Sequence, residues 1–288
     1  MASISARRFG AVFDNVASEY ERSRPAYPDE LVNRACLLAG IEAGDRVLEV
    51  GCGTGQLTRS LTARGLHVTA VERGKQLISL AEQKLGGAPG LEFVNARFED
   101  AQLPEGRFRA VFSAAAFQWL DPDVSWQKAA RMLAPEGTLT LIQYCGLQDE
   151  RSIGDQEALL SALARIAPEI AADWPTSHDL PTLLAGAEQR RENISDVWAW
   201  VGSHDVARPE AGSLFCGVEI ATVSKLVEQT ADELNALLRT ASFYQRISPA
   251  QRRALEDEHV AIYERLRRPI RSSMVAVLVT ARRSTVPV

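Results

Sequence analysis

The sequence has few cysteines, and their spacing excludes two kinds of structural site. Only four occur in 288 residues, at Cys36, Cys52, Cys145 and Cys216, and no two of them form a C-x-x-C pair. Structural zinc sites and disulfide frameworks need cysteines that are grouped or paired at short, regular spacing. The sequence therefore predicts no metal site and no disulfide framework, and it fits a reducing, cytoplasmic compartment.

Two further absences restrict the partners. No apolar run approaches the ~20 residues that a membrane-spanning helix needs, and residues 1–13 lack the apolar stretch of a secretion signal. Basic charge is not in excess, because 32 Lys and Arg stand against 37 Asp and Glu. We therefore expect a soluble protein that binds neither a membrane nor nucleic acid, and we interpret the basic cluster at 267–271 as a solvated face. Assembly into a homo-oligomer stays open.

Strand and helix patterns alternate through the first half of the chain. The runs typical of strands are 46–50, 67–72, 91–98, 109–116 and 137–145, and the patterns typical of helices are 55–65, 75–85 and 124–133. Such alternation favours right-handed β-α-β units, a parallel sheet and helices on both faces of that sheet.

The second half has a different pattern. Residues 146–212 consist of helix and loop patterns, strand patterns return at 215–221 and 272–283, and helices are predicted at 231–242 and 249–268. We predict an α/β protein with one domain over residues 1–288. Its parts are a cofactor-binding core at 1–145, a helical cap or substrate insertion at 146–212, and a completion of the sheet at 213–288.

The turn after the first strand, in "RVLEVGCGTGQLT" (46–58), is rich in glycine, which would let the backbone come very close to a ligand. A phosphate-binding loop of the G-x-x-x-x-G-K-[ST] type requires a lysine that this turn lacks. A dinucleotide fingerprint, G-x-G-x-x-G, places its third glycine one position later than Gly55. The glycines could also serve only a tight strand-to-helix turn. The glycines alone thus leave the ligand open.

Two carboxylates near the turn narrow the choice. Glu49 stands two residues before Gly51, where a buried acid needs a partner such as a ligand ammonium group. Glu72 ends the second predicted strand, where open α/β sheets place an acid that accepts hydrogen bonds from ribose hydroxyls. A nucleoside with an amino-acid tail satisfies all three features, and S-adenosylmethionine is such a molecule.

At this point the sequence resembles the class I S-adenosylmethionine-dependent methyltransferases, in particular the small-molecule, type 11-like members. "VLEVGCGTG" is similar to their first motif, "NARFEDAQLP" (95–104) to the segment around the adenine, and "FSAAAFQWLDPD" (112–123) to the fourth-strand segment. The resemblance implies a three-layer Rossmann-like fold with a mostly parallel sheet and a late antiparallel strand. It implies S-adenosylmethionine as cofactor, held by Tyr20, Arg24, Glu49, Gly51, Cys52, Gly53, Gly55, Gln56, Glu72, Phe98, Glu99, Ala114 and Gln118.

Methyl transfer from a sulfonium is an in-line displacement that needs no metal, so the protein must orient the acceptor, exclude water and accept a proton where the acceptor loses one. We expect the acceptor against the turn after the fourth strand and under the insertion. The predicted acceptor contacts are Phe117, Trp119, Trp198, Trp200 and Arg190. The predicted bases are Glu169 and His178, with Glu188, Glu192 and His204 as further candidates.

The function predicted from the sequence is C-, O- or N-methylation of a small molecule, and Arg190 leaves an anionic or prenyl-type acceptor open. Two alternatives remain at this point. One is a methyltransferase that acts on RNA or protein. The other is a non-catalytic cofactor-binding module, or the same fold used for another reaction, because a fold alone does not determine function.

Overall fold

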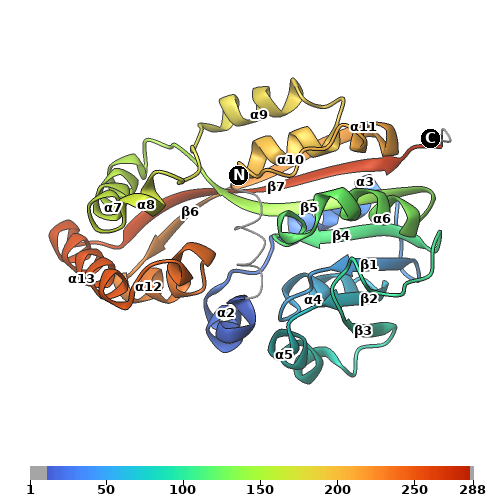
Figure 1. Cartoon of the computed structure of the whole chain (residues 1–288), viewed down its shortest axis with the longest axis horizontal. Coiled ribbons are helices and arrows are strands. Elements are labelled where there is room, and N and C mark those ends of the chain that lie inside the picture. The colour runs from blue at the N-terminus through green and yellow to red at the C-terminus, as the bar shows by residue number, and fades with distance from the viewer. Residues whose placement is uncertain (1–11, 286–288) are drawn as a thin grey trace.

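The computed structural model describes residues 12–285. Residues 1–11 and 286–288 lie outside the described part. Residues 1–11 include the start of the predicted cofactor-binding core and most of the stretch considered for a secretion signal. Within the described part, seven strands form one sheet in the order β3-β2-β1-β4-β5-β7-β6 (Figure 1). The strands are β1 (Arg46–Val50), β2 (His67–Glu72), β3 (Leu91–Asn95), β4 (Phe108–Ala114), β5 (Leu133–Gly146), β6 (Phe215–Gln229) and β7 (Ile270–Arg283).

The direction of the strands confirms the predicted fold class. Strands β1 to β5 pair in parallel, whereas β7 runs antiparallel to both β5 and β6. Parallel neighbours require crossover helices, which cover both faces of the sheet. The protein is therefore a three-layer α/β structure with a mostly parallel sheet and a late antiparallel strand.

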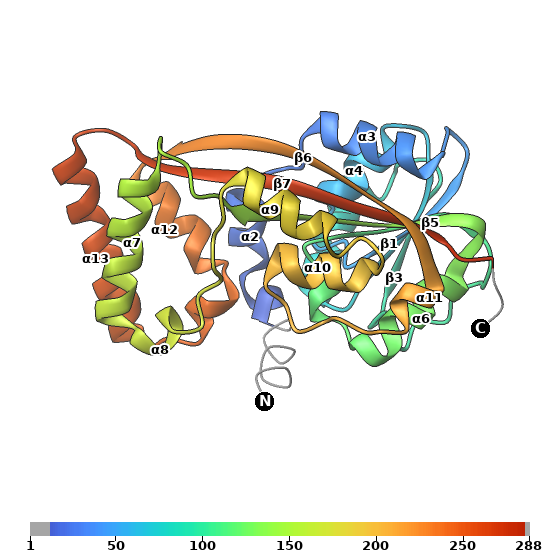
Figure 2. The same cartoon turned by 90° about the horizontal axis from the view of Figure 1, so that it is seen from above.

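Both faces of the sheet are buried, because successive strand residues point to opposite sides. Along β7, Val275, Val277 and Val279 belong to the core shared with one helical layer, and Ala276 and Leu278 belong to the core on the other face. Figure 2 shows the two layers on either side of the strands. One layer contains α3 (Asp29–Ala39) and α4 (Gln56–Thr62), and the other contains α6 (Pro122–Met132), α10 (Ile194–Gly202) and α11 (Ala211–Leu214). Helix α5 (Lys75–Leu85) contacts β2 and β3.

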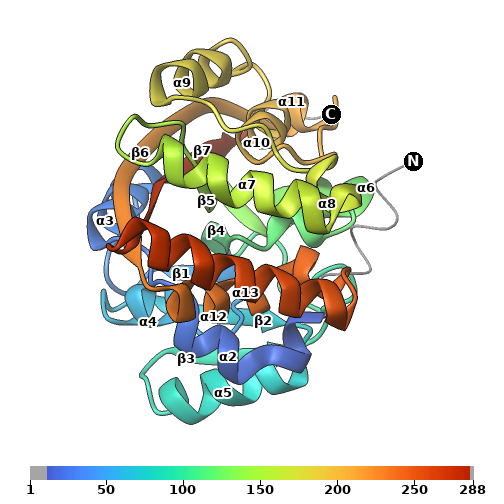
Figure 3. The same cartoon turned by 90° about the vertical axis from the view of Figure 1, so that its left-hand side faces the viewer.

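Strands β6 and β7 continue past the rest of the sheet. The pairing of β5 with β7 ends at Gly146 opposite Met274, whereas β6 and β7 stay paired as far as Gln229 opposite Ile270. This two-stranded ribbon carries a group of helices that we call the helical arm (Figures 1 and 3). The arm consists of α7 (Ile153–Ile166), α8 (Pro168–Ala171), α12 (Ala231–Arg239), η3 (Ser242–Gln245) and α13 (Pro249–Leu266).

Local sequence signals determine where two helices of the arm begin. Thr230 and Glu233 form a capping box at the start of α12, and Ser248 and Gln251 form one at the start of α13. In each box, two side chains satisfy backbone N–H groups that the first helical turn leaves unpaired. No described helix, the 18-residue α13 included, is long and apolar enough to cross a membrane.

Residues 146–212 are divided between two places, which differs from the single cap expected from the sequence. Helices α7 and α8 pack into the arm, where Leu163 and Ile170 join a core with residues of η3 and α13. Helices α9 (Leu180–Glu188), α10 and α11 instead contribute to the main core above the sheet, through side chains such as Val197 and Trp198. Helical periodicity identifies an apolar stripe but not the surface that the stripe covers, which is why the sequence did not reveal this division.

A buried acid attaches the arm to the ribbon, and its removal should destabilise the fold. Asp155 of α7 is 5% exposed and accepts hydrogen bonds from Arg268 at 2.7 and 2.8 Å and from the Arg271 N–H at 2.8 Å. Burial would raise its pKa, but these bonds lower the pKa below its ordinary value. We expect Asp155→Ala to reduce the free energy of unfolding by about 1–3 kcal/mol, measured by urea denaturation, because it leaves buried donors unpaired.

A matched control is available on the same ribbon. Glu228 pairs with the Arg271 side chain at 2.8 Å, but both side chains are well exposed. Glu228→Ala should therefore change the free energy of unfolding by less than about 0.5 kcal/mol. Equal losses in the two variants would contradict the anchoring role of Asp155.

Candidate functional site

The glycine turn between β1 and α4 lies at the carboxyl edge of the sheet. Gly51, Gly53 and Gly55 have φ angles of 74°, 57° and 87°, which side-chain-bearing residues rarely adopt. A Cβ on Gly51 would lie 2.3 Å from the Ala116 Cβ, so this position tolerates only glycine. Gly51 and Gly53 line a cavity, while Cys52, Gly55 and Gln56 are absent from its lining. The turn thus exposes backbone to the cavity at two of its three glycines.

Glu72, at the end of β2, holds this turn in place. Its side chain accepts hydrogen bonds from the Gly53 N–H at 3.0 Å and the Gly74 N–H at 2.7 Å. Burial raises the pKa of Glu72, although these N–H groups favour the ionised form. The residue lines the cavity, and each carboxylate oxygen has capacity for a further donor.

Glu49 occupies a different place from the one that its predicted role requires. Its side chain is 1% exposed, accepts a hydrogen bond from the Thr58 hydroxyl at 2.7 Å, and does not line the cavity. Burial raises the pKa of Glu49 to about 7. The acid therefore lies beneath the turn, where it links β1 to α4.

The segment before β1 folds over the glycine turn. Asp14 in η1 (Val12–Val16) accepts hydrogen bonds from the Gln76 and Leu77 N–H groups at the start of α5. In α2 (Ala17–Ser23), Glu21 pairs with Lys84 at 2.6 Å and accepts a hydrogen bond from Thr54 within the turn. These contacts place the following pair of predicted cofactor contacts at the cavity.

Tyr20 and Arg24 both line the cavity. The Arg24 guanidinium lies 5.2 Å from the Tyr20 ring centroid and donates to the Thr240 hydroxyl at 2.9 Å and to the Thr240 carbonyl at 3.0 Å. Because Thr240 follows α12, Arg24 connects the segment before β1 with the helical arm.

The segments after β3 and β4 supply the next part of the lining. Phe98 and Glu99 line the cavity, and Lys128 supports them by donating to the backbone carbonyls of Glu99 and Ala101. Glu99 itself accepts a hydrogen bond from the Asp121 N–H at 2.9 Å. The predicted adenine segment is thus held from behind by α6.

The turn after β4 separates two residues that were predicted together. Ala114, Gln118 and Trp119 line the cavity, whereas Phe117 is 1% exposed and packs on Trp126 with ring centroids 4.6 Å apart. Phe117 is therefore a core residue rather than part of the lining. The Gln118 Nε2 donates to the Ala115 carbonyl, and its Oε1 is buried without a partner among the described residues.

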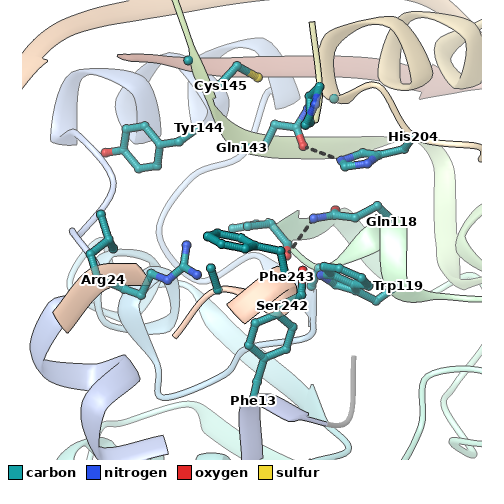
Figure 4. A pocket seen from close by; sticks show the side chains of 18 of the residues that line it. Phe13, Arg24, Gln118, Trp119, Gln143, Tyr144, Cys145, His204, Ser242 and Phe243 are labelled. Carbon is teal, nitrogen blue, oxygen red and sulfur yellow. Dashed lines mark hydrogen bonds between the residues drawn. The ribbon is translucent and has the colours of Figure 1, made fainter. Parts of the chain in front are cut away.

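The cavity has a volume of about 620 Å³ and continues from the glycine turn into the helical arm. In Figure 4, Gln118, Trp119 and His204 lie on one side, Arg24 and Tyr144 lie on the other, and Phe243 lies between them. The arm section of the lining is mostly apolar, with Leu159, Leu160, Leu163, Trp174, Leu234, Leu237, Leu238, Phe243 and Leu255. Pockets of this size and composition are typical of small-molecule sites.

Several predicted acceptor and base residues lie outside this lining. His178 stacks on Trp200 with ring centroids 4.7 Å apart, and the Arg190 guanidinium lies 4.4 Å from the Trp200 ring centroid. Trp198 is fully buried in the main core, and Glu169 is exposed and accepts a hydrogen bond from Gln251. None of these five residues lines the cavity. Their helical spacing and residue type did not distinguish a surface or core position from a lining one.

His204, the further base candidate, lines the cavity together with Gln143. The His204 Nε2 lies 3.2 Å from the Gln143 Oε1, and burial lowers the pKa of His204 to about 4, so the ring is neutral at pH 7. The Gln143 Nε2 is buried without a partner among the described residues. Gln143 was not among the residues predicted from the sequence, although a glutamine inside the apolar run "LTLIQYC" indicates a buried polar group that needs a partner.

The known proteins that this chain resembles are methyltransferases. Residues 48–141 match the family described as "Methyltransferase domain". An uncharacterized methyltransferase of Mycobacterium bovis is 35% identical over 147 residues, which are 51% of this chain and 57% of that protein. A demethylmenaquinone methyltransferase of Clavibacter sepedonicus is 29% identical over 139 residues, which are 46% of this chain and 57% of that protein. The chain thus spans little more than half the length of these relatives.

The fold is also found in solved structures. A structure from Anaeromyxobacter dehalogenans, described as a candidate type II methyltransferase, has a TM-score of 0.57 and 20% sequence identity, and it covers 90% of this chain and 97% of that one. At this low identity the likeness concerns the fold alone.

The raised pKa of Glu49 gives a pH-dependent prediction. Below about pH 4.5 the acid is neutral in both the folded and the unfolded chain, and as the pH rises to about 7 the unfolded chain ionises first, so stability is lost. We expect the free energy of unfolding to fall by roughly 3 kcal/mol over this interval through Glu49 alone. In Glu49→Gln, whose amide is neutral at every pH, this contribution should disappear.

Urea denaturation at pH 5 and pH 8 measures this difference. The exposed Glu92 provides the control, since Glu92→Gln should keep the wild-type pH dependence. If Glu49→Gln loses stability between the two pH values as steeply as the wild type, Glu49 is not the group responsible.

Proposed function

We propose that this chain, whose residues 48–141 match a methyltransferase domain, is a class I S-adenosylmethionine-dependent methyltransferase that transfers a methyl group from S-adenosylmethionine to a neutral, largely apolar small molecule. The observation that carries the proposal is one continuous cavity. It joins the glycine turn and Glu72 to a leucine-lined section in the helical arm.

The cavity's sheet-edge section fits the cofactor. The positive φ of Gly53 and the space above it leave the backbone open to a close ligand. Glu72 would accept hydrogen bonds from the ribose hydroxyls, Phe98 and Glu99 would contact the adenine, and Tyr20 and Arg24 would lie near the methionine carboxylate. When bound, the cofactor supplies a methyl group on a sulfonium, which is activated for displacement without a metal.

The polar residues near the turn after β4 would orient the acceptor. Gln118 has a buried carbonyl oxygen without a partner, and Gln143 has a buried amide nitrogen without one, among the described residues. A bound molecule that pairs with these atoms would recover the cost of their burial. His204 is neutral and too weak a base to hold a proton at pH 7, so we assign it to hydrogen bonding with the acceptor.

The lining supports a neutral acceptor. The charged lining residues among those described are Arg24, Glu72, Arg73, Arg97 and Glu99, and none of them belongs to the helical arm. Leu160 and Trp174 are 40% and 36% exposed and line the cavity, which gives the arm section an apolar rim. A charged acceptor would lose hydration there without gaining a partner. Arg190, on which the expectation of an anionic acceptor was based, instead packs its guanidinium over the Trp200 ring.

Cofactor binding tests the first half of the proposal. We expect Glu72→Ala to weaken S-adenosylmethionine binding by about 1.5–3 kcal/mol, because a charged acceptor of hydrogen bonds is lost and the turn around Gly53 loosens. Isothermal titration calorimetry measures the change. Glu92→Ala, at an exposed position on β3, should retain wild-type affinity. Wild-type affinity in Glu72→Ala would refute the assigned role.

Methyl transfer to defined acceptors tests the second half. We expect the enzyme, given S-adenosylmethionine with a labelled methyl group, to label neutral apolar phenols and amines in preference to carboxylates and phosphates of similar size. Mass spectrometry of the products measures this preference. Cofactor binding without transfer to any member of a broad acceptor panel would support a non-catalytic module. Preferred labelling of anionic acceptors would contradict the proposal that the acceptor is neutral.

A further inference from the structure

A buried histidine stands out in the apolar section of the cavity. His259 of α13 is 3% exposed and lines the cavity. Other residues of the arm that line the cavity include Leu234, Leu237 and Leu255. Its Nδ1 lies 2.7 Å from the Asn235 Oδ1. Its Nε2 has no hydrogen-bond partner among residues 12–285. A polar atom without a protein partner, on a residue that lines a cavity, is available to whatever occupies that cavity.

The neighbouring amide determines which ring nitrogen carries the proton. The Asn235 Nδ2 faces the Glu256 carbonyl oxygen at 3.5 Å, and the opposite amide orientation would set two acceptor oxygens against each other. The Asn235 Oδ1 therefore accepts from a protonated Nδ1 of His259. Because burial lowers the pKa of His259, the ring is neutral and its Nε2 carries a lone pair.

The polar groups behind the histidine are already paired. Glu256 accepts hydrogen bonds from Arg239 at 2.7 and 2.9 Å and from the Tyr244 hydroxyl. Asn235 is held between His259 and the Glu256 backbone. This network fixes the ring and its tautomer, and the Nε2 of His259 is the acceptor that the network leaves for a ligand.

We propose that His259 binds a hydrogen-bond donor on the acceptor molecule, so that the substrate class is a neutral, mainly apolar compound with a hydroxyl or N–H group within the helical arm. This inference rests on the proposed function, because it takes the arm section of the cavity as the acceptor site. His259 acts here in specificity. The leucines favour apolar surface, and the lone pair on Nε2 selects against compounds that place only an acceptor, such as an ether or ketone oxygen, beside it.

Two probes that differ only in donor capacity test the inference. 4-Hexylphenol donates a hydrogen bond, whereas 4-hexylanisole, its methyl ether, only accepts. Their dissociation constants are measured by calorimetry on the full chain with S-adenosylhomocysteine present, so that no methyl group is transferred. We expect His259→Phe to reduce the preference for the phenol over the ether by about 3- to 10-fold relative to wild type, since one hydrogen bond is lost.

Leu237→Ala is the matched control from the same lining. It removes apolar contact without changing hydrogen bonding, so it should weaken both probes by a similar factor and keep the wild-type preference. An unchanged preference in His259→Phe would overturn the inference, as would an equal loss of preference in Leu237→Ala.

A measurement on the wild-type protein covers the case in which His259→Phe does not fold. The chain has four histidines, and ¹⁵N labelling of their rings reports protonation at each nitrogen. Replacing His67, His178 and His204 by asparagine, one at a time, assigns the remaining signals to His259. We expect an unprotonated Nε2 whose resonance shifts on addition of 4-hexylphenol and not of 4-hexylanisole. A protonated Nε2, or no shift with the phenol, would overturn the inference.

The two proposals fail in distinguishable ways. A chain that does not bind S-adenosylmethionine in calorimetry refutes the proposed function. A chain that binds S-adenosylmethionine but shows no dependence of probe preference on His259 refutes only the role of this histidine.

Discussion

The antiparallel pairing of β6 with β7 determines where the cavity lies. The parallel strands end at one edge, and a ligand there would be open to solvent unless another element covered it. Because β6 and β7 remain hydrogen bonded as far as Gln229 and Ile270, they carry the helical arm beyond that edge. Arg24 then joins the arm to the segment before β1 through Thr240. The cavity is therefore bounded by segments from near both ends of the described chain, and its volume depends on both connections.

Charge is distributed unevenly along this cavity, and the distribution suits methyl transfer. The charged side chains gather at the sheet edge, where Glu72 is held by two backbone N–H groups, and the arm section is lined by leucines and aromatic rings. An acceptor that displaces water from an apolar section would leave less solvent to rearrange during a reaction. The cavity thus combines a polar section beside the glycine turn with a mostly apolar section in the helical arm, where we propose that the acceptor binds.

Sequence patterns predicted the sheet well because its signals are local. Alternation along "SSMVAVLVTARR" identifies β7, and the glycine turn with Glu72 identifies the edge where a cofactor would bind, since strand ends meet at the same edge of a parallel sheet. The lining contains most of the predicted cofactor residues, including Tyr20, Arg24 and Gln118. Glu49 shows the limit, because its position near the turn was visible but the direction of its side chain, toward Thr58 and away from the cavity, was not.

Of the polar residues in the section that we propose for the acceptor, only His204 was a predicted candidate, and the section as a whole was hidden from the sequence for a different physical reason. Its polar atoms come from Gln143 on β5, His204 after α10 and His259 on α13, and these meet only through tertiary packing. Trp198 and Trp200 have the residue type expected of an aromatic cap, yet α10 turns one into the core and pairs the other with His178. What separates His259 from these residues is a property that the folded chain alone reveals: one ring nitrogen is fixed by Asn235, and the other faces the cavity without a partner. A side chain that is held firmly on one edge, and has no protein partner on the other edge at the wall of a cavity, is positioned to bind a ligand, which is why we attribute it to ligand recognition.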